Sequence, residues 1–565
     1  MNREDNYWLR RRVTRRRWLG GALTTGAGLA AVATVGCGDD DDTGASTATA
    51  TGAGTAAATG TAPAASPATQ AVKDGDRVRI AFPAEPTTVD PHESTAGTDQ
   101  LYLTALYNAL AHVDEKGGVT PSLAESYDVS PDGMKITVKL RKGVTFHNGD
   151  AFTADDVKFS LERVLSKDFK ASKVSFAAVD TTAVVDPNTI VFNMKKPDYL
   201  FVGTGFGGLY IVPKAYSERV GKDGFLSAPI GTGPYKLKSR TVGTGAVFER
   251  FDTHFAGKVA GFKNADLALV PDATARVQML EVGEKDVIIA IPPEQFARSK
   301  TLSGVKVIQQ AGSNDTYFAF PLRDDVAGLA PGPTRTLLKD KRVRQALNYA
   351  VDRDNIAKKV FSGLATPFSV TVPTQPFHIG KKYEYDAKKA KDLLSAAGAN
   401  GMAINQYMLA GSRLPGLQPL GAAVASNLRD VGVTVNEINE EFQNWLNRLY
   451  ADRPPYPDEG MSFSWAGSAS GLNITLMEGK WLSTGATSWY ANPKVDELLG
   501  KNRATANPEE RNTYIKQACE ILYEDAAGLW MVLIDDAIGI KSSVAADWKH
   551  RASYNVLRIM DLFPA

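Results

Sequence analysis

The chain has 565 residues, of which 43% are hydrophobic and 22% charged, so it is neither a fibrous nor a wholly disordered protein. Its net charge is +1, but residues 1–36 hold seven arginines against only Glu4 and Asp5. The remaining chain therefore carries a net charge of −4, and we expect this mildly acidic body not to bind nucleic acid.

The first informative segment is the basic leader. Residues 14–21 (TRRRWLGG) place Arg15 and Arg16 before an aromatic residue and a leucine, an order similar to the twin-arginine export signal, although Trp18 stands where phenylalanine is more usual. Residues 19–35 are only weakly apolar, and they are too short and too polar to form a membrane-spanning helix of about 20 apolar residues. They predict the apolar region of a signal peptide that covers residues 1–36.

Cys37 follows this leader and is one of only two cysteines. It resembles the lipid-acceptor cysteine of bacterial lipoproteins, with Thr34 in the position usually held by leucine. Alternatively, residues 31–33 (AVA) form an A-x-A cleavage site, which would leave Cys37 as a free thiol. Residues 43–72 are almost entirely Thr, Ala, Gly, Ser and Pro, a composition that cannot bury enough apolar surface to fold. We expect a lipid-anchored flexible linker over residues 37–73.

Strand and turn patterns begin near Asp74. Val78 and Ile80 alternate with arginines, which predicts a short, half-buried strand. Residues 130–133 (SPDG) are typical of a turn, and the alternation of apolar and polar residues over 134–140 predicts the next strand.

Helix starts are marked by capping residues. Thr153 and Asp156 are spaced as a capping box, ahead of a buried stripe formed by Val157, Leu161 and Val164. Four further positions predict N-caps: Asp340, Asp352, Asp386 and Asn507. Strand and helix patterns alternate along the chain, so α/β lobes are expected. The second cysteine, Cys519, falls within a helical pattern and is expected to be a small buried residue.

A family resemblance extends over some 480 residues of this body. Residues 121–165 resemble the signature region of family 5 solute-binding proteins of ABC importers, the dipeptide, oligopeptide and nickel-binding type. Segments similar to the same family follow one another in order: 89–95 (VDPHEST), 105–110 (ALYNAL), 231–239 (GTGPYKLKS), 270–293, 339–367, 385–398 and 492–525.

The resemblance implies a two-lobed periplasmic binding protein fold, of type II and the large peptide-binding class, with an extra subdomain. The implied division assigns residues 74–110, 231–325 and 530–565 to lobe I, residues 111–230 to the extra subdomain, and residues 326–529 to lobe II. The implied function is an extracytoplasmic receptor that captures a peptide or similar small solute and delivers it to an ABC permease and its ATPase subunits. We expect a monomer, exported and tethered to the outer face of the cytoplasmic membrane.

The solute-facing residues are inferred from the same resemblance. Relatives carry a tryptophan and, three residues later, an aspartate that holds a peptide's terminal amine. Here Trp465 matches the tryptophan, with Ser464 beside it, but Ser468 stands where the acid would be. Phe442 resembles a second aromatic position of the cleft. Glu93, Ser94 and Thr95 lie where a strand end of lobe I meets the cleft, and Asp458 and Glu459 are alternative carboxylates. Core packing for the two aromatic residues, and a solvated loop for Glu93, are the competing interpretations.

Other chemistries find less support. Residues 203–208 (GTGFGG) fit G-x-G-x-x-G, but a strand ending at Pro213 is expected after them, where a dinucleotide site needs a helix. The six histidines are scattered singly, so we expect no metal site and no cofactor. A secreted carboxylate-pair hydrolase, and a signalling or scavenging receptor without a permease, stay open as alternatives.

Overall fold

The computed structural model describes residues 75–565, apart from residues 95–96, 114–117, 170–175, 258–260, 327–331, 374, 411–413, 450–459, 468–473, 486 and 549–556. The chain separates into two units, Met1–Ala71 and Val72–Ala565, and every described element belongs to the second. The expected signal peptide, Cys37 and the linker lie outside the described residues.

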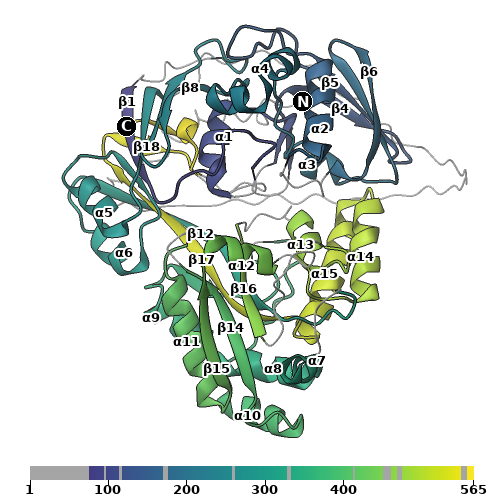
Figure 1. Cartoon of the computed structure of the whole chain (residues 1–565), viewed down its shortest axis with the longest axis vertical. Coiled ribbons are helices and arrows are strands. Elements are labelled where there is room, and N and C mark those ends of the chain that lie inside the picture. The colour runs from purple at the N-terminus through teal and green to yellow at the C-terminus, as the bar shows by residue number, and fades with distance from the viewer. Residues whose placement is uncertain are drawn as a thin grey trace, which may run out of the picture. The chain divides into compact units, whose positions relative to one another are not determined.

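One large mixed sheet runs through the second unit (Figure 1). Its strands, in spatial order, are β15 (Thr434–Glu440), β14 (Ala403–Leu409), β16 (Gly460–Gly467), β12 (Val305–Ala319), β17 (Gly528–Lys541), β11 (Val287–Ile289), β1 (Gly75–Phe82), β10 (Phe262–Leu269), β9 (Gly245–Arg250) and β8 (Tyr235–Thr241), with β13 (Ala365–Pro367) also paired to β17. We name β11, β1, β10, β9 and β8 the first half of this sheet, and β15, β14 and β16 the second half. Parallel pairs join β1 to β10 and β11, and β14 to β15 and β16.

A separate four-stranded antiparallel sheet comes from residues between β1 and β8 in sequence, and we call it the small sheet. Its strands are β4 (Ala124–Val129), β5 (Lys135–Leu140), β7 (Thr189–Met194) and β6 (Val179–Asp186). Two short pairs complete the described strands: β2 (Ala111–Val113) with β3 (Val119–Pro121), and β18 (Val544–Ala546) with β19 (Leu562–Pro564). Residues between 110 and 211 form a buried hydrophobic cluster around the small sheet.

The helices connect and cover these sheets. Those of the first part of the chain are α1 (Gln100–Leu106), α2 (Ala154–Leu165), α3 (Phe201–Thr204), α4 (Lys214–Ser227), α5 (Ala273–Glu281) and α6 (Pro293–Ser299). Those of the second part are α7 (Pro333–Lys339), α8 (Lys341–Ala350), α9 (Arg353–Lys359), α10 (Ala387–Ala396), α11 (Leu417–Asp430), α12 (Phe442–Leu449), α13 (Ile474–Trp481), α14 (Pro493–Ala504) and α15 (Pro508–Glu524). Among the described residues, no helix has the length and apolar character needed to cross a membrane.

The two halves of the large sheet meet at β12 and β17, which Figure 1 shows running side by side. The first six residues of β12 pair with the end of β17, whereas its last six pair with β16 on one edge and the start of β17 on the other. Between these stretches the register shifts, and Gly312 takes a positive φ of 66°. The Asp535 carboxylate accepts hydrogen bonds from the Gly312 N–H and from Gln309 Nε2, both at 2.6 Å. At this β-bulge the buried Gly312 N–H, which has no partner in the strand ladder, is therefore satisfied by a side chain of the neighbouring strand.

The helix-capping predictions are confirmed. Thr153 and Asp156 form a capping box at the start of α2, and Val157, Leu161 and Val164 are buried. The other predicted caps each accept a backbone N–H, namely Asp340 for α8, Asp352 for α9, Asp386 for α10 and Asn507 for α15. Cys519 is buried in α15, as expected.

The strand expected after residues 203–208 is not present. The glycines begin inside α3, and Tyr210 makes only an isolated bridge to Ala109 before Pro213 precedes α4. The apolar run packs into the cluster around the small sheet instead of extending a ladder. A helix thus begins six residues after the glycine run, with Pro213 as its N-cap, rather than directly from the glycines as a dinucleotide site requires.

Residues 231–235 (GTGPY) show why glycine is required there. The Gly233 N–H donates to the Leu106 carbonyl at 2.8 Å, so two backbones are in direct contact. A Cβ atom added to Gly233 would lie 2.3 Å from the Ala105 carbonyl oxygen, and one added to Gly231 would lie 2.1 Å from that of Leu106. Only glycine permits this approach.

We predict that Gly233→Ala lowers the free energy of unfolding by about 3 kcal/mol, because the methyl group forces β8 away from the end of α1. Gly500→Ala is the matched control, since no atom lies within 4 Å of its added Cβ in α14 and mid-helix alanine gains up to about 1 kcal/mol. Urea unfolding followed by circular dichroism measures both, and equal midpoints for the two variants would contradict this explanation.

Candidate functional site

The residues predicted to face the solute lie in two segments. Glu93 and Ser94 belong to the connection between β1 and α1, which we call the β1–α1 loop and which ends in a short 3-10 helix (Gly97–Asp99), and Thr95 lies outside the described residues. Ser464 and Trp465 are neighbours on β16, where their backbones pair with Tyr317 and Thr316 of β12.

The other predicted positions are described only in part. Phe442 is the first residue of α12, and its side chain, like that of Trp465, lies outside the described atoms. Ser468, Asp458 and Glu459 lie outside the described residues altogether. The solute-facing roles of these residues therefore stay predictions.

Asp99 folds the β1–α1 loop back on itself. Its carboxylate is fully buried and accepts hydrogen bonds from the Thr87 N–H at 2.6 Å and from the Ser94 hydroxyl at 2.8 Å. A buried carboxylate is stable only when such donors replace water. The hydrogen bond to Asp99 thus orients the Ser94 side chain. The only trace of this contact in the sequence is that a carboxylate follows Ser94 five residues later.

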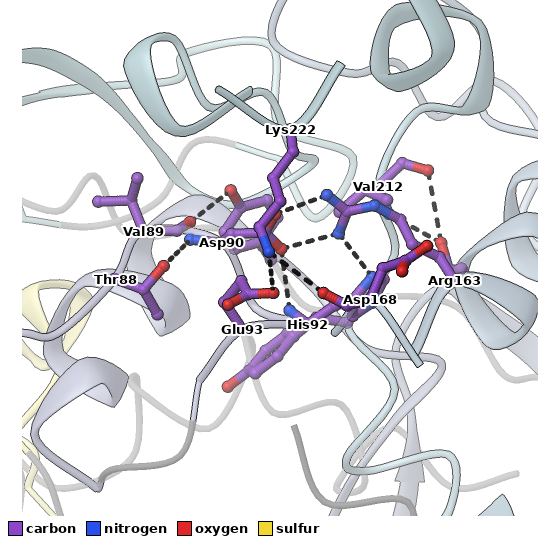
Figure 2. Close-up of polar contacts among 12 residues, drawn as sticks. Thr88, Val89, Asp90, His92, Glu93, Arg163, Asp168, Val212 and Lys222 are labelled. Carbon is purple, nitrogen blue, oxygen red and sulfur yellow. Dashed lines mark hydrogen bonds and ion pairs between the residues drawn. The ribbon is translucent and has the colours of Figure 1, made fainter. Parts of the chain in front are cut away.

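A buried arginine of α2 anchors the middle of this loop (Figure 2). Arg163 donates to both carboxylate oxygens of Asp90, at 2.8 and 2.5 Å, and both side chains are at most 6% exposed. Its guanidinium lies 4.0 Å from the centre of the Phe169 ring and 5.1 Å from that of Phe225. A bidentate, stacked arginine holds one geometry, so the loop is tied firmly to α2.

The same arginine determines the protonation state and tautomer of His92. Arg163 donates to His92 Nδ1 at 2.9 Å, while Nε2 lies 3.1 Å from the Tyr210 carbonyl oxygen. Nδ1 must accept and Nε2 must donate, which only the neutral ring with its proton on Nε2 can do. Burial, and then the positive charge of Arg163, lower the pKa of His92 to about 4.

Glu93, the predicted solute contact on this loop, is already paired. Lys222 of α4 lies 2.8 Å from its carboxylate, and the Glu93 side chain is 9% exposed (Figure 2). Lys222 also donates to the Asp168 carbonyl at 3.1 Å and lies 5.3 Å from the Phe169 ring centre. A solute ammonium group could use Glu93 only by displacing Lys222. In this structure Glu93 is not the solvated loop carboxylate of the competing interpretation.

On the β12 side, Ser464 borders a cluster of aromatic side chains. The Tyr317 hydroxyl is hydrogen-bonded to Ser464, and burial raises the pKa of Tyr317. Lys480 pairs with Asp315 at 3.0 Å and lies 4.8 Å from the Tyr317 ring centre. The Trp481 and Trp530 rings contact Tyr317 in tilted arrangements, with ring centres 5.3 and 5.9 Å away.

The hollow beside this aromatic cluster is too small for a solute. It is lined by Tyr317, Lys480, Trp481, Trp489 and Tyr490 among others and has essentially no free interior volume, whereas ligand pockets start at roughly 300 Å³. The cluster therefore serves as a packed support behind β16. The sequence analysis did not single out Lys480 or Trp481. Lys480 lies 165 residues after Asp315, so the sequence does not indicate that the two are in contact.

Metal binding finds no support in the part of the chain that the structure describes. No three His, Cys, Asp or Glu side chains there are grouped so that they could hold a metal ion.

Comparison with known proteins identifies the family. The sequence model described as "Bacterial extracellular solute-binding proteins, family 5 Middle" matches residues 118–481, more than half of the chain. The glutathione-binding protein GsiB of Escherichia coli (strain K12) is 27% identical over 476 residues, which cover 82% of this chain and 89% of GsiB.

Solved structures share the fold. The periplasmic binding protein DppA from Helicobacter pylori, in complex with the peptide STSA, aligns with a TM-score of 0.74 at 22% identity and covers 87% of this chain and 98% of its own. NikZ from Campylobacter jejuni, in complex with Ni(L-His), aligns with a TM-score of 0.72 at 23% identity and covers 86% of this chain and 99% of its own. These likenesses confirm the predicted two-lobed α/β fold of periplasmic peptide-binding proteins.

We predict that acid weakens the fold through His92. An unfolded histidine, with a pKa near 6.5, takes up a proton that folded His92 refuses until about pH 4. Its contribution to stability is therefore complete above pH 6.5 and is lost as the pH falls toward 4. At 1.36 kcal/mol per pKa unit, the loss is roughly 3 kcal/mol.

His92→Gln isolates this contribution, because an amide can still accept from Arg163 and donate to the Tyr210 carbonyl without titrating. Urea unfolding at pH 7 and pH 4 should show a smaller loss of stability for the variant than for the parent. Parallel pH curves for the two proteins would show that His92 is not the responsible group.

Proposed function

The chain belongs to the bacterial extracellular solute-binding proteins of family 5, and we propose that it captures a peptide or similar small organic solute for an ABC importer. The observation that carries the proposal is the family match over residues 118–481, together with a fold shared with periplasmic binding proteins over most of the chain. A solute-binding family is not a catalytic one, so the protein acts by binding and release rather than by turnover.

The proposed mechanism is closure of two lobes about the solute. Lobe I comprises residues 74–110, 231–325 and 530–565, with residues 111–230 as its extra subdomain, and lobe II comprises residues 326–529. Solute that binds better to the closed form shifts the population toward it, and this form docks on the permease. Turnover of a solute would instead favour the hydrolase alternative, and a chain that binds solute with no permease partner would favour a signalling or scavenging receptor.

Export and anchoring are part of the proposal. Arg15 and Arg16 direct a folded precursor to the twin-arginine route, which suits a body without structural disulfides. Cys37 carries the lipid, and residues 43–72, whose Thr-, Ala-, Gly-, Ser- and Pro-rich composition is typical of a tether, link it to the body. The receptor is thereby held at the outer face of the cytoplasmic membrane.

The proposed solute contacts are Trp465, Ser464, Ser468 and Phe442 from one side, with Glu93, Ser94 and Thr95 from the other. Ser468 offers no negative charge to a peptide's amine, and the Glu93 carboxylate is engaged by Lys222. An ammonium group buried without a carboxylate costs several kcal/mol. The preferred solute is therefore neutral or anionic, or a peptide held by its backbone and by stacking on Trp465.

Calorimetric titration tests this recognition. Glutathione, which the relative GsiB is named for, and Ser-Thr-Ser-Ala, the peptide in the DppA complex, are titrated with their N-acetylated forms. For any of these peptides that binds, we expect the free and acetylated forms to differ by less than about threefold in affinity, and Ser468→Asp to favour the free form. A preference of more than about a hundredfold for the free amine, surviving Ser468→Ala, would show an ammonium site elsewhere.

Cell fractionation tests the anchor. Cys37→Ala should abolish lipid modification and move the exported protein from the membrane to the soluble fraction, because no other anchor is proposed. Cys519→Ala, which alters the other cysteine, is the control and should stay at the membrane. A parent protein that is already soluble, with a mature N-terminus at Thr34, would favour cleavage after Ala33 and sink the lipoprotein assignment.

A further inference from the structure

A short segment after β7 connects two different hydrophobic clusters. Residues 195–200, which we call the strap, lead from the small sheet into α3. Phe201 packs with the cluster around the small sheet, whereas Leu200, only 6% exposed, belongs to the cluster of α13–α15 and the central strands β12 and β17. The chain thus changes from one core to the other between two successive residues.

Buried ion pairs stabilise the contact between the strap and helices α13 and α14. Arg503 of α14 lies 2.6 Å from Asp198 of the strap and 2.5 Å from Glu478 of α13. The Asp198 side chain is 0% exposed, Glu478 is 3% exposed and Arg503 is 13% exposed. Asp198 and Arg503 are 305 residues apart in the sequence. Asp198 could not stay charged and fully buried without Arg503, whereas Arg503 has Glu478 as a second counterion.

The strap is also fixed to both sides through Tyr199. Its N–H donates to the Arg503 carbonyl at 2.9 Å, and its hydroxyl donates to the Pro131 carbonyl at 2.9 Å. Pro131 lies in the turn between β4 and β5, so the ring of Tyr199 is anchored in the small sheet while its backbone holds α14.

Each side of this contact is attached to a different half of the large sheet. The small-sheet region is tied to the first half by the bidentate pair Arg163–Asp90 and by His147, whose Nε2 lies 2.9 Å from the Gly233 carbonyl oxygen. Helices α13–α15 share a core with Tyr317 of β12 and Trp530 of β17. Both residues lie in the stretch beyond the bulge, where β12 pairs with β16 of the second half. The strap therefore bridges the two halves at a place separate from the β12–β17 junction itself.

We propose that Asp198, Arg503 and Glu478, with Leu200, form a latch that holds the protein closed before any solute binds. When the latch opens, Asp198 returns to water and Arg503 keeps Glu478 as its counterion within the α13–α14 pair. Because desolvation of the buried charges offsets part of their attraction, the pair adds only a modest net free energy to the closed form, so the contact can both hold that form and open. The inference goes beyond solute capture and does not depend on the identity of the solute.

Distances between spin labels test the latch in the full chain without solute. The labels are placed at Val185→Cys on β6, where the side chain is 63% exposed, and at Lys516→Cys, an exposed position of α15. Cys37→Ser removes one native thiol, and the other, Cys519, is buried. Asp198→Asn removes one charge yet keeps the oxygen that accepts the Leu200 N–H, and Arg503 stays paired with Glu478. Asp180→Asn, an exposed position of β6, is the matched control.

We expect a short-distance class in the parent, an unchanged distribution with Asp180→Asn, and a class at least about fivefold smaller with Asp198→Asn. A parent that shows only long distances, or an Asp198→Asn distribution equal to the parent's, would overturn the proposal. If Asp198→Asn does not fold, as judged by circular dichroism, Leu200→Ala takes its place, because it weakens only the apolar part of the latch. An unchanged short-distance class with Leu200→Ala would likewise overturn the proposal.

Discussion

The pairing of β12 with β17 is the constraint on which the rest of the structure depends. These two long strands carry both halves of the large sheet, since β11 pairs with β17 on one side and β16 with β12 on the other. Their ladder shifts register twice, between Gln310 and Asn314 and again between Asp315 and Tyr317, and at the first of these bulges the Asp535 carboxylate accepts the Gly312 N–H. Antiparallel strands bend and twist most easily at such a bulge. Any relative movement of the two halves must pass through this ribbon, which suits a protein that closes on a solute.

The electrostatics of the β1–α1 loop follow from how deeply its charged side chains are buried. Asp90, Asp99 and Glu93 each find donors or a cation within the protein, from Arg163, Ser94 and Lys222 respectively. A loop with its charges already compensated presents little net field to a solute, and its shape is held by the same contacts. With the solute contacts proposed above, discrimination among solutes would depend on shape, stacking and neutral hydrogen bonds more than on a single fixed charge.

Features determined by local sequence were predictable, and features determined by distant residues were not. Capping at Thr153 and Asp386 depends on neighbours three residues away, so the spacing alone identifies the helix starts. The prediction of a strand before Pro213 was wrong, because packing of these apolar side chains against the small sheet outweighed their β propensity. Nothing in the sequence pairs Arg163 with Asp90, or Arg503 with Asp198, because only the folded chain brings these residues together. The family resemblance supplied the candidate solute contacts, which residue patterns alone could not.

Native mass spectrometry of the protein purified from its own host tests the central claim most directly. A receptor that captures a solute between two lobes should retain one small molecule per chain, and mild denaturation should release that molecule intact. We expect a single stoichiometric mass difference that is lost on unfolding and restored when the isolated solute is added back. A chain that carries no solute and binds none from its host's medium, or one that converts the added molecule into a product, would contradict the account.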